Sequence, residues 1–193
     1  MARVRKLFPI YGSTLANSML VTLVHDRVVA GFVAAYITRY DRQGILGGPA
    51  RDRELAETVG REILLAMIVA VGDSLPAFFG RKQKSKLKSE EKAAVDAFFA
   101  ELLGGLERAK NWNAEDRKEF RRDLSLYADF SARRELVAKT RKGKKLREEE
   151  APFVARVALL LDPSMLEQAR MAARKFYGEV AKLAQKLLRK TLG

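Results

Sequence analysis

Cysteine is absent from the 193 residues, and histidine occurs only once, as His25. Without thiols the chain has no cysteine nucleophile, no disulfide framework and no zinc site built from cysteines. A single histidine cannot supply the two Glu-x-x-His pairs of a di-iron helical bundle, and no orienting partner accompanies it as a catalytic base. We therefore expect a non-enzymatic protein without a metal or cofactor.

Proline and glycine are also scarce, with 5 and 13 residues, whereas hydrophobic residues make up 48% of the chain. That apolar content argues against global disorder. The length suits a single domain over residues 1–193, since a chain of this size buries about 70% of its unfolded surface. The lack of cysteine fits a reducing compartment, and we expect a cytoplasmic protein.

Long hydrophobic runs are missing as well. The longest unbroken apolar run covers residues 63–71, and the apolar stretch 15–37 is interrupted by His25, Asp26 and Arg27. A membrane-spanning helix needs about 20 mostly apolar residues. The basic N-terminus, residues 1–12, also lacks the apolar core of a signal peptide. These patterns predict no transmembrane segment.

The most apolar region, residues 15–40, is expected to form a central helix with Ser13 as its N-cap, because apolar side chains fall on nearly every side. A hairpin is the alternative. Residues 19–24 and 28–33 are rich in β-branched side chains, and 25–27 could turn between them. Ala34 and Ala35 favour the helix, and the choice stays open at this level.

Apolar spacing and capping residues predict the remaining helices. The second is expected from an N-cap at Asp52 to about Val71, with an end or kink at 72–76. The others are a third helix after an N-cap at Ser89, a fourth opened by an Asn113–Asp116 capping box, a fifth from Glu148 or Pro152 to Leu161, and a last one over 165–192. The sequence thus predicts an all-α, single-domain bundle of five or six helices, with Trp112 filling the core at a junction.

Positive charge is concentrated in three places. The formal net charge is +13, and it gathers in two connectors, 81–88 and 139–147, and on one face of the last helix. At about 100° per residue the cations of that helix lie within about 60° of one another. The candidate binding residues are Arg81, Lys82, Lys84, Lys86, Lys88, Lys139, Arg141, Lys142, Lys144, Lys145, Arg147, Lys175, Lys182, Lys186 and Arg189.

Such clusters predict a non-enzymatic binding protein whose cationic surface engages a polyanion, with nucleic acid as the favoured partner. Arginine would bind phosphates in bidentate fashion and lysine as a point charge. The bland interpretation is that these are solvated lysine-rich loops, with 139–147 a mobile basic connector. Two further alternatives stay open. One is a helical protein-interaction or oligomerisation module that pairs through the last helix, and the other is peripheral membrane association.

Overall fold

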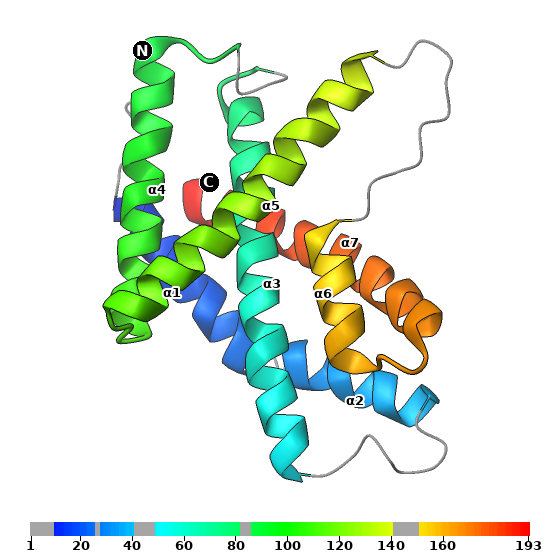
Figure 1. The fold of residues 1–193 in the computed structure, drawn as a ribbon. Helices are drawn as coiled ribbons and strands as arrows, with labels where there is room; N and C mark the ends of the chain where they lie inside the picture. The colour runs from blue at the N-terminus through cyan, green and yellow to red at the C-terminus, as the bar shows by residue number, and fades with distance from the viewer. Residues whose placement is uncertain (1–9, 26–27, 41–48, 82–85, 141–150) are drawn as a thin grey trace.

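The computed structural model describes residues 10–25, 28–40, 49–81, 86–140 and 151–193, and every regular element in them is a helix (Figure 1). The all-α, single-domain bundle is therefore confirmed. The helices are α1 (Ile10–His25), α2 (Val28–Tyr40), α3 (Pro49–Phe78), α4 (Ser89–Ala109), α5 (Ala114–Thr140), α6 (Pro152–Leu161) and α7 (Leu166–Leu192). The first two occupy the region expected to form one helix.

The region 15–40 is helical on both sides of residues 26 and 27, which lie outside the described residues, so the hairpin alternative is wrong. Ser13 is not an N-cap, because α1 begins at Ile10. Its hydroxyl instead donates a hydrogen bond of 2.9 Å to Glu101 on α4. Helix α1 lies very close to α4, because a Cβ atom on Gly12 would collide with the Phe98 carbonyl oxygen.

Helix α3 runs through the middle of the molecule and contacts α2, α5, α6 and α7 (Figure 1). All residues from Glu62 to Val69 are buried, which is why its sequence is apolar on every side. The helix begins at Pro49 rather than after a cap at Asp52, so the predicted start was wrong. It continues through Pro76 to Phe78, so the predicted end at 72–76 was wrong too, whereas the alternative of a kink there stays a prediction. Pro76 lies in the last turn, where a proline destabilises the helix little. Gly80, with a φ of 71°, follows the helix and ends it.

Helices α4 and α5 begin with carboxylate side chains that satisfy backbone N–H groups. At α5 the expected capping box is confirmed: the backbone N–H groups of Asn113 and Asp116 donate to each other's side chains at 3.1 and 2.9 Å. At α4 the N-cap is Lys88 rather than Ser89, and its backbone N–H donates to Glu91 at 2.8 Å. Helix α5 reaches Thr140, so the backbone of Lys139 is helical rather than part of a connector.

Helices α6 and α7 pack against each other and are joined by a short connection, residues 162–165 (Figure 1). Helix α6 starts at Pro152, the later of the two expected positions. The buried Asp162 carboxylate accepts hydrogen bonds from the backbone N–H groups of Ser164 and Met165 at 2.9 and 3.1 Å, which fixes the turn. The buried side of α7 packs on α3, α6 and α1 within the same molecule. Its buried residues are Ala169, Ala173, Phe176, Val180, Ala184 and Leu188.

The stretch Ile10–Arg39 is long and apolar enough to cross a membrane by length and hydropathy alone, although the core helix of a soluble protein passes the same test. Leu15, Ala16 and Met19 on α1 are fully buried in the bundle. On α2 the exposed positions are mostly small: Ala30, Gly31, Ala34 and Ala35. The expected absence of a transmembrane segment stays a prediction.

Candidate nucleic-acid interface

The cationic face of α7 comprises Lys175, Lys182, Lys186 and Arg189, and all four are exposed. The helical repeat places them together, on the side of α7 opposite its buried alanines, Val180 and Leu188. At about 1.5 Å per residue, the face extends about 21 Å along the helix axis. One acidic residue, Glu179, is exposed on the same side.

None of these four cations forms an ion pair with a carboxylate in the part of the chain that the structure describes. The arginines of α5 behave differently. Arg121 forms an ion pair with Glu107 at 2.7 Å, and Arg122 lies 3.7 Å from Glu119. The cationic face of α7 is therefore a row of solvated positive charges without internal counterions among the described residues.

The first connector places its cations differently. Arg81 is half-buried and donates hydrogen bonds of 3.2 and 3.3 Å to the Glu91 carboxylate. These bonds, followed by the backbone N–H of Lys88, hold the pKa of Glu91 below its ordinary value. Arg81 is thus committed to joining the end of α3 to the start of α4. Lys86 and Lys88 are exposed, and Lys82 and Lys84 lie outside the described residues.

The second connector cannot be compared in the same way. The backbone of Lys139 belongs to α5, and its side chain is not among those described. His25 is also helical, with its side chain outside the description. The remaining cations lie outside the described residues: Arg141, Lys142, Lys144, Lys145 and Arg147. Of the three predicted groups, only that of α7 is therefore described in full.

Sequence reasoning missed a cluster of charged groups packed between α3, α5 and α6, the α3–α5–α6 ion cluster. Its core is Glu62, Asp123, Tyr127 and Arg156, with Glu62 and Asp123 only 5% and 4% exposed. Arg156 bridges the two acids, at 3.3 Å from Glu62 and 3.1 Å from Asp123. Arg61 reaches Asp123 from the other side at 3.1 Å.

Tyr127 completes this cluster by donating a hydrogen bond to Glu62. Burial raises the pKa of Tyr127, and the nearby charge of Glu62 raises it further. The phenol therefore stays protonated and acts as a donor. The hydrogen bond that Arg156 donates to Asp123 raises the pKa of Arg156, and the charge of Glu62 also raises it. Buried carboxylates held by arginines and a phenol join α5 and α6 to α3, which is a structural role.

The sequence did contain a signal for this cluster. Glu62 directly precedes the apolar run 63–71, on a helix expected to be buried, and a buried acid requires a partner. Nothing in the sequence indicates that the partners are Tyr127 and Arg156, which are 65 and 94 residues away. Within the described ranges, no group of three or more metal-ligating side chains comes together.

Comparison with known proteins gives no match: no family model, no curated protein and no solved structure is significantly similar to this chain.

Proposed function

We propose that this protein binds nucleic acid through the cationic face of α7. The observation that carries the proposal is the row of four exposed cations, Lys175, Lys182, Lys186 and Arg189, on the side of α7 turned away from the core. A polyanion that contacts this row releases its condensed counterions, and this release supplies most of the binding free energy.

Four exposed cations that form one row and lack carboxylate partners favour α7 over Arg81 and Arg121. Arg81 and Arg121 already have carboxylate partners, so a phosphate would have to compete with Glu91 and Glu107. The four cations of α7 have no such competitor among the described residues. Phosphate contacts of this kind position a nucleic acid without reading its bases, so we expect binding without strong sequence preference.

The length of the row also suits a nucleic-acid backbone. Lys182, Lys186 and Arg189 are one helical turn apart, about 5–6 Å, and Lys175 lies about 10 Å further toward the start of the helix. A duplex carries one negative charge about every 1.7 Å of its axis, so several phosphates lie within reach of the row. The net charge of +13 adds long-range attraction to any polyanion.

The test is fluorescence anisotropy with a labelled single-stranded RNA and a labelled DNA duplex of random sequence. One variant neutralises the face with K175Q, K182Q, K186Q and R189Q. A matched variant removes the same charge from α5 with R117Q, K118Q, R121Q and R122Q. Circular dichroism and thermal unfolding check that both variants fold.

We expect the α7 variant to lose at least tenfold in affinity at low salt, and the α5 variant to lose much less. Equal losses would mean that net charge alone drives binding, and the proposal would be wrong. No binding by the unchanged protein at low salt would also overturn it. If anionic vesicles compete for the same α7 residues while RNA and DNA do not bind, the partner is a membrane surface instead.

A further inference from the structure

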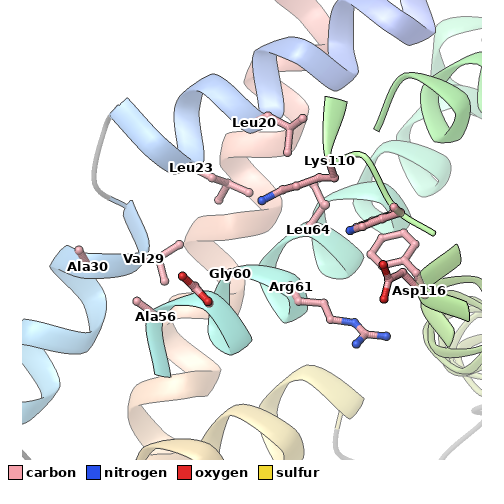
Figure 2. Close-up of a pocket in the computed structure, with 13 residues that line it drawn as sticks. Leu20, Leu23, Val29, Ala30, Ala56, Gly60, Arg61, Leu64, Lys110 and Asp116 are labelled. Atoms are coloured by element: carbon pink, nitrogen blue, oxygen red, sulfur yellow. The ribbon is translucent and has the colours of Figure 1, made fainter. Parts of the chain in front are cut away.

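A pocket of about 490 Å³ opens where the end of α1, the start of α2 and the connection between α4 and α5 meet α3 and the start of α5 (Figure 2). Its walls are mainly apolar and include Leu20, Leu23, Leu64, Trp112 and Phe120. The rings of Trp112 and Phe120 lie 4.5 Å apart between centroids and form an aromatic wall. Its volume is within the range typical of small-molecule sites, about 300–1,000 Å³.

The charged groups in this pocket are placed unequally. Figure 2 shows the Lys110 side chain reaching across the pocket toward Leu23, whereas the Arg61 guanidinium points away from its centre. Arg61 is held by Glu119 and Asp123 at 3.3 and 3.1 Å. No described carboxylate forms an ion pair with Lys110.

Two acidic residues, Glu57 and Asp116, also line the pocket. The Asp116 carboxylate accepts the backbone N–H of Asn113, so it is already used by the capping box of α5. The exposed Lys110 ammonium, which has no carboxylate partner among the described residues, favours a ligand group that carries negative charge.

We propose that this pocket, the Lys110 pocket, binds a small amphipathic anion. The apolar or aromatic body of the ligand would pack against the leucines and the Trp112–Phe120 wall, and its carboxylate or sulfonate would pair with the Lys110 ammonium. This proposal is independent of nucleic-acid binding, because Lys110 lies at the end of α4 and not on the cationic face of α7.

Trp112 provides a direct reporter, because it is the only tryptophan in the chain and it lines the pocket. The probes are anilinonaphthalene sulfonate and N-phenyl-1-naphthylamine, which share an aromatic body but differ in the sulfonate. Energy transfer from Trp112 to a bound probe shows that the probe sits near this pocket. We expect saturable transfer at one probe per protein, with the sulfonate probe binding more tightly.

Two kinds of variant distinguish recognition of the ligand's apolar body from recognition of its anionic group. G60L is expected to fill the pocket and to weaken both probes at least tenfold. It should fold, since a Cβ atom at this position lies 3.7 Å from Val29, an ordinary contact. A56F is a second variant with the same purpose. K110M should weaken the sulfonate probe about fivefold and leave the uncharged probe unchanged, as expected for loss of one partly exposed ion pair.

The control is K186M, which removes a cation from the face of α7 and should change neither probe. Equal affinity of the two probes, or no response of the sulfonate probe to K110M, would overturn anion recognition. Binding that survives both G60L and A56F would place the probe elsewhere and reject the pocket. Tighter binding of a cationic naphthylamine would assign the pocket to Glu57 and Asp116, contrary to the proposal.

Discussion

Helices α5 and α7 have the same length, 27 residues each, and both carry many cations, yet these cations have opposite surroundings. On α5, Arg121 and Arg122 pair with acids of α4 and α5, and Asp123 is buried against Arg61 and Arg156. On α7, Lys175, Lys182, Lys186 and Arg189 form a solvated row. The arginines of α5 therefore pair with carboxylates inside the protein, whereas the cationic face of α7 stays available to a partner.

The difference arises from where the acids lie. Helix α5 contributes its own carboxylates, Asp116, Glu119 and Asp123, and it faces Glu62 of α3 and Glu107 of α4. Helix α7 has only Glu167 and Glu179, and Glu167 is paired with Arg170 at 2.7 Å. Counting cations along the sequence thus overstates the surface that a polyanion can use, because the position of the acids decides which charges are compensated.

The largest effect is expected for R156M, which removes the arginine at the centre of the α3–α5–α6 ion cluster. It leaves Glu62 with only Tyr127, and Asp123 with Arg61 and the more distant Arg122. Removing one partner of a buried ion pair costs about 3–5 kcal/mol, and we expect about 3 because a third of this side chain reaches solvent. Urea unfolding measures the change.

The matched control for R156M is R122M, whose side chain is 69% exposed and whose ion pairs are long, at 3.7 Å. Exposed pairs contribute about 0–1 kcal/mol, so a small change is expected. Equal effects of R156M and R122M on the free energy of unfolding would show that the ion cluster does not hold α5 and α6 to α3.

Y127F tests the same cluster through pH. Loss of the hydrogen bond to Glu62 should cost about 1–3 kcal/mol at neutral pH. Because the pKa of Tyr127 is raised in the folded state, its contribution is complete below about pH 10, the value for an unfolded tyrosine, and is lost as the pH rises further. Thermal unfolding between pH 8 and 11 should therefore show a shallower alkaline decline for Y127F than for the unchanged protein.

N113A probes the capping box at the start of α5, the helix whose arginines pair with acids. Removing an N-cap side chain costs about 1 kcal/mol, and the backbone N–H of Asp116 would lose its acceptor. N113D, which keeps an acceptor oxygen, should retain most of the stability. A full loss in N113D as well would indicate that packing at Trp112, and not the cap, is responsible.

E91Q tests the pairing that commits Arg81, a candidate connector cation, to the fold. Since the pKa of Glu91 is lowered in the folded state, its pairing with Arg81 stabilises the protein above about pH 4.5 and is lost as the pH falls through the folded pKa. E91Q should therefore reduce the melting temperature slightly at pH 7 and by less at pH 3. A constant difference at both pH values would contradict this account.

The sequence permitted the fold class and most elements to be predicted, because their signals are local. Phe120, Tyr127 and Phe130 are buried at helical spacing on α5, and Asn113 forms the expected cap. The predicted helix boundaries were wrong where tertiary contacts compete with local sequence preferences. Ser13 looked like an N-cap but binds Glu101, and Pro76 looked like a helix end but lies in the last turn of α3.

In the candidate site, too, the features set by local sequence were predictable and those set by tertiary contacts were not. The face of α7 was predictable, because Lys182, Lys186 and Arg189 follow the helical repeat and need no knowledge of other elements. The commitment of Arg81 to Glu91 depends on how α3 and α4 meet, which no local pattern reports. The Lys110 pocket depends on four helices at once. Trp112 was expected to fill the core, and it is half-buried against Phe120 at the pocket wall.

The most direct test of the central claim, that the unpaired cations of α7 are the polyanion surface, is the salt dependence of DNA binding. If the duplex neutralises all four α7 cations, the logarithm of the association constant should fall with a slope of about −3.6 against the logarithm of salt concentration. Replacing these four residues by glutamine should bring that slope close to zero, while the matched α5 variant should retain it. A slope that is unchanged in the α7 variant, or that falls equally in both, would contradict the account.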